Sequence, residues 1–80
     1  MPVAYGSTTK SKIERYLRTT EISPFTIKEL QLKLERHGIN ATISNIRHTL
    51  NELEINNWVY LVHDHPKTYQ VAERWKIKNT

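Results

Sequence analysis

Residues 42–51 bring together several side chains that could hydrogen bond to the edges of nucleobases. Arginine can donate two hydrogen bonds to guanine, and asparagine can make a similar two-point pair with adenine. Serine and histidine add further donors and acceptors. The same residue types are also typical of the solvated face of a surface helix. The residues that we expect to face bases are Ser44, Asn45, Arg47, His48 and Asn51.

The charge of the chain favours a polyanionic partner. Its 80 residues include 12 Lys and Arg against 8 Asp and Glu, a net charge of +4. Most of the excess lies in the first twenty and the last fourteen residues. Cations that neutralise phosphates release counterions and so give affinity without sequence information. A surface that is basic for solubility alone would give the same balance. The expected phosphate contacts are Lys10, Lys12, Thr42 and Lys67.

No catalytic or metal-binding constellation stands out in the sequence. His63 and His65 flank Asp64, but zinc sites need three or four ligands, so we interpret these as exposed turn residues. The chain has no cysteine, no glycine-rich phosphate loop and no Ser/His/Asp order. We therefore expect no enzyme, no metal, no cofactor and no small-molecule effector.

Two capped helices are predicted in the first half of the chain. Ser11 and Glu14 have the spacing of a capping box, which predicts a helix from residue 11 to about residue 20. Thr26 and Glu29 repeat the pattern and predict a second helix. Gly38 is placed to end that helix in a left-handed conformation. Between the two helices, residues 22–25 contain a proline and read as a break.

A third helix, residues 42–56, positions the candidate base-facing side chains. Ile43, Ile46, Leu50 and Leu53 fall in one arc of the helical wheel and predict its buried face. The polar side chains of the first paragraph then lie on the outward face or flank it. Asparagines tolerate a left-handed backbone, so residues 56–57 are the expected stop.

The sequence period then changes to that of β-strands. Residues 58–63 and 68–72 predict a hairpin, with a proline-containing turn at 64–67. We expect Trp58, Tyr60 and Tyr69 to pack within the hairpin. Trp75 and Ile77 follow it, and they either close the core beside the first helix or form a dimer contact.

The order of these elements resembles the winged helix-turn-helix family. Between the second and third helices, residues 35–42 form a short turn with a glycine and an apolar plug, Ile39. Residues 46–59 resemble the recognition helix and first wing strand of winged-helix transcription regulators. The resemblance covers residues 11 to about 72, and Asn57 stands where the family usually has glycine.

The resemblance implies an α+β winged helix-turn-helix fold of three helices followed by a β-hairpin wing. We expect a flexible tail at 1–10, the winged-helix domain at 11–72 and a basic extension at 73–80. It also implies sequence-specific binding of double-stranded DNA and transcription regulation, as in small effector-free regulators of bacteria, phages and plasmids. Helix 42–56 would enter the major groove, with hairpin 58–72 as the wing.

Other functions stay open. The third helix carries only Arg47 against Glu52 and Glu54, which favours a protein–protein interaction module in a larger assembly. An accessory DNA-architecture or replication factor would present the same surface. A homodimer or another protein partner is also compatible, and a helical bundle with an incidental hairpin is the structural alternative. The lack of cysteine, signal peptide and membrane span favours a cytoplasmic protein, nucleoid-associated if bacterial.

Overall fold

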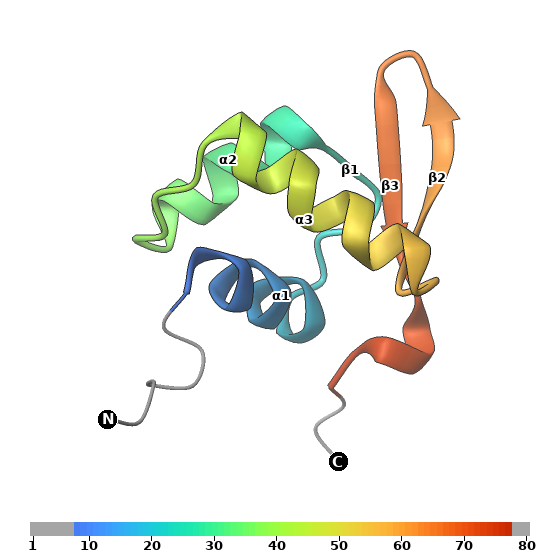
Figure 1. The fold of residues 1–80 in the computed structure, drawn as a ribbon, viewed down its shortest axis with the longest axis horizontal. Coiled ribbons are helices and arrows are strands. Elements are labelled where there is room, and N and C mark those ends of the chain that lie inside the picture. The colour runs from blue at the N-terminus through green and yellow to red at the C-terminus, as the bar shows by residue number, and fades with distance from the viewer. Residues whose placement is uncertain (1–7, 78–80) are drawn as a thin grey trace.

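The computed structural model describes residues 8–77 as a small α+β fold with three helices and a three-stranded antiparallel sheet. Figure 1 shows the β2–β3 hairpin projecting beyond the helices, an arrangement compatible with a winged-helix-like layout. The elements in chain order are α1 (Thr9–Thr19), β1 (Phe25–Thr26), α2 (Ile27–Arg36), α3 (Ile43–Ile55), β2 (Val59–Asp64), β3 (Lys67–Val71) and the 3-10 turn η1 (Glu73–Trp75).

The predicted N-cap of α1 is wrong. Thr8, in extended backbone, caps the helix, and its hydroxyl accepts a hydrogen bond from the Ser11 backbone N–H at 3.1 Å. Because Thr8 offers a capping hydroxyl three residues earlier, Ser11 lies inside the first turn. Thr9 and Lys10, which we expected in a tail, are therefore helical. The rest of that expected tail, residues 1–7, lies outside the described residues.

The capping box of α2 is confirmed. The Thr26 hydroxyl accepts from the Glu29 N–H at 3.1 Å, and the Glu29 carboxylate accepts from the Thr26 N–H at 2.9 Å. The helix ends as predicted near Gly38, whose φ of +78° is left-handed. The chain then turns so that the Ile39 N–H donates to the Leu34 carbonyl oxygen at 2.8 Å.

Helix α3 closely follows its prediction. The Thr42 hydroxyl caps the helix by accepting a hydrogen bond from the Asn45 N–H at 3.0 Å. After the helix ends, Asn57 adopts a left-handed backbone with a φ of 62°. Ile46, Leu50 and Leu53 are buried, whereas Ile43 is only partly buried. The structure adds Thr49 to the buried face, at 2% exposure.

The sheet contains a strand that the sequence did not predict. Residues 22–25, which the sequence predicts as a break between two helices, lead into β1. There Phe25 pairs with Tyr69 and Thr26 pairs with Thr68 of β3. The strand order is β1-β3-β2, so β3 is central and β2 is an edge. The predicted hairpin is present, with its turn at residues 65–66 and a bulge between Leu61 and His63 in β2. β1 ties the start of α2 to β3 of the β2–β3 hairpin, which we call the wing.

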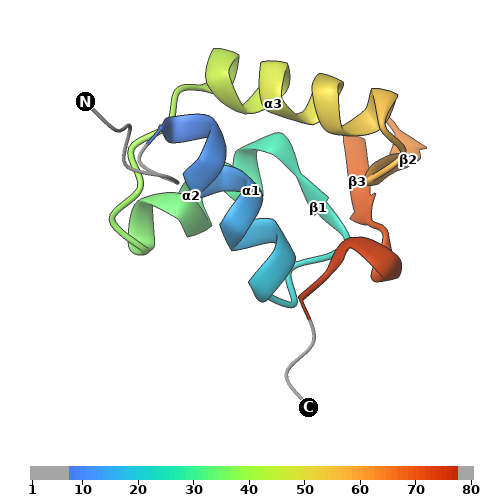
Figure 2. The ribbon, with the colours of Figure 1, turned by 60° about the horizontal axis from the view of Figure 1, so that its bottom comes forward.

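The C-terminal segment completes the core beside α1. Trp75 is 7% exposed and stacks on Trp58, with ring centroids 5.9 Å apart. The Arg18 guanidinium donates to the Trp75 carbonyl at 2.7 Å, and the Ile77 N–H donates to the Arg18 carbonyl at 2.9 Å. Figure 2 shows this segment passing the C-terminal end of α1. Of the two roles considered for Trp75, closing the core is therefore the one observed, while Ile77 stays half exposed.

Candidate nucleic-acid interface

A groove of about 710 Å³ lies between the first turn of α2, the exposed side of α3 and the wing. It receives one cation from each wall: Lys28 from α2, Arg47 from α3 and Lys67 from the wing. No acidic side chain lines it. Figure 1 shows these elements meeting at the end of the molecule that carries the wing tip. The lining residues are Thr26, Ile27, Lys28, Arg47, Asn51, Pro66, Lys67 and Tyr69.

Arg47 and Asn51 form the α3 wall of the groove. They are four residues apart, so they lie on adjacent turns of one helix face, and both are exposed. No ion pair within residues 8–77 involves Arg47. The guanidinium fork and the carboxamide are therefore both available for two-point hydrogen bonding.

Tyr69 is the aromatic residue among those that line the groove. Its ring stacks on Phe25 at a centroid distance of 6.1 Å, and the residue is 3% exposed. Burial raises the pKa of the Tyr69 phenol; the Glu54 carboxylate raises it further, and Arg47 opposes both. The phenol therefore stays protonated at neutral pH and can act as a hydrogen-bond donor.

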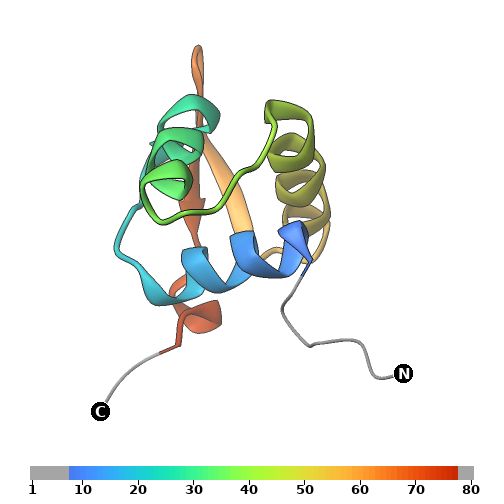
Figure 3. The same cartoon turned by 90° about the vertical axis from the view of Figure 1, so that its left-hand side faces the viewer.

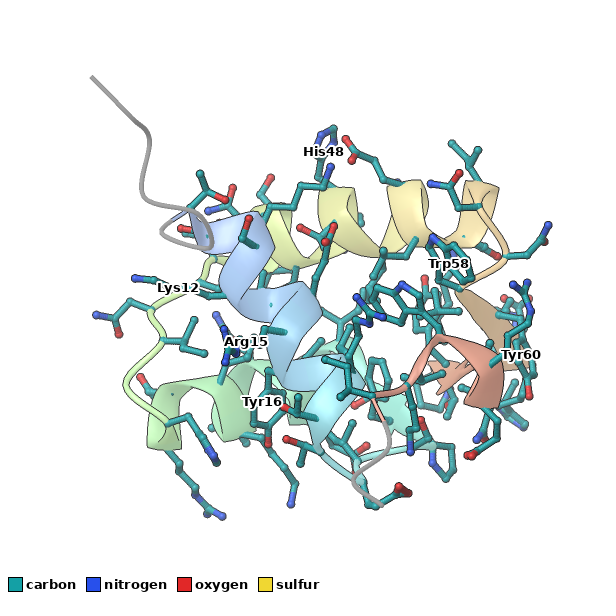
Figure 4. The ribbon with its side chains drawn as sticks, turned by 90° about the horizontal axis from the view of Figure 1, so that it is seen from below. Lys12, Arg15, Tyr16, His48, Trp58 and Tyr60 are labelled. Atoms are coloured by element: carbon teal, nitrogen blue, oxygen red, sulfur yellow. The ribbon has the colours of Figure 1, made fainter. Side chains whose placement is uncertain are left out.

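The other predicted base-facing residues lie outside the groove. Ser44, Asn45 and His48 are exposed on the remainder of the α3 surface, as the helical wheel indicated. Figure 4 shows His48 projecting away from the helices. His48 Nε2 lies 3.0 Å from a carboxylate oxygen of Glu52, one turn further along α3.

Lys10 does not face the groove but pairs with α3. Its ammonium forms an ion pair with the second carboxylate oxygen of Glu52, so α1 and α3 are linked at the surface. The hydrogen bond to Lys10, with smaller contributions from His48, lowers the pKa of Glu52. The same bond raises the pKa of Lys10. The Glu52 carboxylate thus stays ionised, and the Lys10 ammonium compensates its charge on the surface of α3.

The remaining expected phosphate contacts have different positions. Lys67 lies in the groove, and the Thr42 side chain is engaged as the cap of α3. Lys12 lines a separate hollow with residues of α1. The sequence analysis did not predict Lys28 as a groove residue, because Lys28 lies between Thr26 and Glu29 and the pattern there indicates only a capping box. It reaches the groove because β1, also missed, places the start of α2 next to the wing.

The cations near the C-terminus hold the fold together. Arg74 lies 4.7 Å from the Trp58 ring centroid and donates to the Asn57 carbonyl at 2.9 Å. Lys76 Nζ, whose side chain is 6% exposed, contacts the Glu21 carboxylate at 2.7 Å. Like Arg18, which donates to the Trp75 carbonyl, both residues therefore make contacts within the protein. The basic composition of this segment suggested a polyanionic partner, but Arg74 and Lys76 already have contacts within the protein.

The described part of the chain shows neither a metal-ligating cluster nor a membrane-spanning helix. Within residues 8–77, no three metal-ligating side chains come together. His65 Nε2 lies 3.4 Å from an Asp64 oxygen in the exposed wing turn. No helix in the same range combines the length and apolar character that crossing a membrane requires.

The chain matches no protein-family model, no curated protein and no solved structure.

Proposed function

We propose that this protein is a winged helix-turn-helix protein that binds double-stranded DNA sequence-specifically and regulates transcription. In this proposal α3 enters the major groove and the β2–β3 hairpin is the wing. The observation that carries it is the groove, in which cations from α2, α3 and the wing converge around Asn51 without an acidic neighbour in the lining. A helix with polar side chains fits the major groove of B-DNA.

The positions of the cations suggest a division of roles. Arg47 and Asn51 are on the helix itself, where they can reach base edges. Lys28 and Lys67 stand on the two walls that flank it, and so suit the phosphates on either side. The Tyr69 phenol, which also lines the groove, adds a neutral hydrogen-bond donor. Ser44 and Asn45 extend the proposed base-facing surface toward the N-terminus of α3, and His48 follows Arg47 on its flank.

The local charge around α3 also supports DNA over a protein partner. In the sequence, Arg47 is outnumbered by Glu52 and Glu54. In the structure, both oxygens of the Glu52 carboxylate have cationic or protonatable neighbours, Lys10 and His48. The exposed surface of α3 is therefore less repulsive to phosphate than its composition indicates.

The direct test is selection of bound sequences from a pool of random 20-base-pair duplexes, followed by fluorescence anisotropy on the enriched sequence. We expect a motif of a few base pairs and tighter binding to it than to a scrambled duplex. Absence of binding to any duplex at 50 mM salt would reject the proposal. Binding without an enriched motif would favour the DNA-architecture role.

A second candidate function rests on exposed apolar side chains. Ile55 is 79% exposed on α3, and Tyr60 and Val62 are 49% and 48% exposed on the edge strand β2. Exposed apolar residues on an edge strand are typical of protein contacts. Light scattering during size-exclusion chromatography tests for self-association. A dimer that fails to bind DNA would favour the protein-interaction module.

A further inference from the structure

A second basic hollow lies on the side of the protein away from the wing tip. It has a volume of about 250 Å³ and is formed by α1 and the turn that joins α2 to α3. Figure 3 shows α1 at the opposite end of the molecule from the wing tip, and Figure 4 looks onto α1 from that side. Its lining residues are Lys12, Arg15, Tyr16, Thr19, Thr20, His37 and Ile39.

The charged residues of this hollow are all basic or protonatable. Lys12 and Arg15 are one turn apart on α1, and both are exposed. Neither side chain takes part in an ion pair or hydrogen bond with another residue of the 8–77 range. This distinguishes them from Lys10, Arg18, Arg74 and Lys76, whose side chains are already engaged.

An aromatic pair gives the hollow a fixed wall. The Tyr16 and His37 rings meet edge to face, with centroids 4.8 Å apart and planes at 73°. Tyr16 is 6% exposed and belongs to the core, so it holds the contact from a packed position. Ile39 adds an apolar surface beside them. The wall therefore combines the buried Tyr16 and the partly buried Ile39 with the exposed His37 ring, and the charge comes from two exposed side chains.

Hydroxyl groups complete the lining. The Thr19 hydroxyl donates its hydrogen to the Arg15 carbonyl at 2.7 Å, which fixes the threonine side chain at the rim. Thr20, at the end of the helix, is only partly exposed. Glu35, near the end of α2, lines a neighbouring depression instead. A bound anion would thus meet two cations and no carboxylate in the lining.

We propose that this hollow binds a small phosphate-bearing anion. The Arg15 guanidinium supplies a planar fork that matches phosphate oxygens, and the Lys12 ammonium supplies a second charge. The volume is below that of most drug-sized sites, so it suits one phosphate group with a small apolar or aromatic attachment against Ile39 and Tyr16. The site is separate from the groove and does not depend on the DNA-binding proposal.

The test uses two-dimensional ¹H–¹⁵N NMR of the whole chain, titrated with inorganic phosphate and then with adenosine monophosphate at constant ionic strength. We expect saturable shifts at Lys12, Arg15, Tyr16, Thr19 and His37. In the double variant Lys12→Ala/Arg15→Ala, affinity should fall at least tenfold. The control Lys33→Ala/Arg36→Ala removes two exposed cations of α2 outside this lining, and it should bind as the parent does. Thermal melts check that both variants are folded.

Two arms identify the source of the phosphate. If a short DNA duplex shifts only groove residues while phosphate or the nucleotide shifts the hollow, the ligand is a small molecule. If the duplex shifts both sets, and the Lys12/Arg15 variant loses the second set, the ligand is a DNA backbone. Shifts that do not saturate, or that weaken equally in both double variants, would overturn the proposal because they indicate general attraction to a basic surface.

Discussion

Lys10 of α1 and Glu52 of α3 form an ion pair that joins the first helix to the helix proposed to read DNA. The pair could not be foreseen from the sequence, in which Lys10 was an expected phosphate contact. Both side chains are partly exposed, at 49% and 38%. The pair therefore has a small effect on folding but sets which charges α3 presents to a ligand.

The first prediction concerns the pH dependence of this pair. Because Lys10 lowers the pKa of Glu52 in the folded protein, the carboxylate contributes stability above its ordinary pKa of 4.5 and loses it as the pH falls through the lowered value. The melting temperature of the parent should therefore exceed that of Glu52→Gln at pH 7, and the difference should shrink as the pH falls below 4.5. Thermal melts of both proteins from pH 7 to pH 2 measure this. A difference that grows on acidification would contradict the assignment.

The second prediction concerns the buried face of α3. Leu50 of α3 is fully buried in the core. Leu50→Ala should therefore lower the free energy of unfolding by about 2–5 kcal/mol. Ile55→Ala is the matched control on the same helix, because Ile55 is 79% exposed, and it should change stability by less than about 0.5 kcal/mol. Urea titrations followed by circular dichroism give both values.

The third prediction tests whether the C-terminal segment belongs to the folded unit. The Trp75 ring stacks on Trp58, and the Arg18 guanidinium lies over it in a cation–π contact, 5.2 Å from the ring centroid. Trp75→Ala should therefore destabilise the protein by about 3–5 kcal/mol. Ile77→Ala, two residues further on and half exposed, should cost much less. Equal, small losses in both variants would show that the segment is only an appendage.

The sequence predicted well those features that depend on local chemistry. The Thr26–Glu29 box, the left-handed residues Gly38 and Asn57, and the buried face of α3 each follow from residues close together in the chain. The N-cap of α1 was misplaced because two hydroxyl residues compete for it, and Ser11 matched the pattern better than Thr8 did.

Features that depend on tertiary contacts were missed. A two-residue strand such as β1 has no measurable period, and only its pairing with Tyr69 and Thr68 defines it. Lys28 enters the groove through that pairing. Conversely, Arg74 and Lys76 look like free surface charges in the sequence, but an aromatic ring and a carboxylate hold them in the fold. A count of charges cannot distinguish the two cases.

The fourth prediction is the salt dependence of DNA binding. If Lys28 and Lys67, the two groove cations proposed to contact the backbone, each neutralise one phosphate, the logarithm of affinity should fall with the logarithm of salt concentration at a slope of about −2. Anisotropy titrations between 50 and 200 mM salt measure the slope. A flat response would mean that these cations do not contact phosphate, which contradicts the DNA proposal.

The fifth prediction separates base recognition from phosphate contact within the groove. Arg47→Ala should weaken binding to the selected duplex by about 1–3 kcal/mol and have a smaller effect on a scrambled duplex, because a two-point guanine contact is lost. Lys67→Ala should weaken binding to both duplexes alike and make the salt slope shallower by about one, because phosphates carry no base identity.

The control for this comparison is Lys33→Ala, which removes an exposed cation of α2 that does not line the groove. It keeps the change in net charge equal to that of the two test variants, so any general electrostatic effect appears in all three. If Arg47→Ala loses affinity equally on both duplexes, α3 contacts the backbone only and the sequence preference must come from elsewhere. If all three variants behave alike, the groove is not where DNA binds, because position relative to the groove is all that distinguishes Lys33 from Lys67 in this experiment.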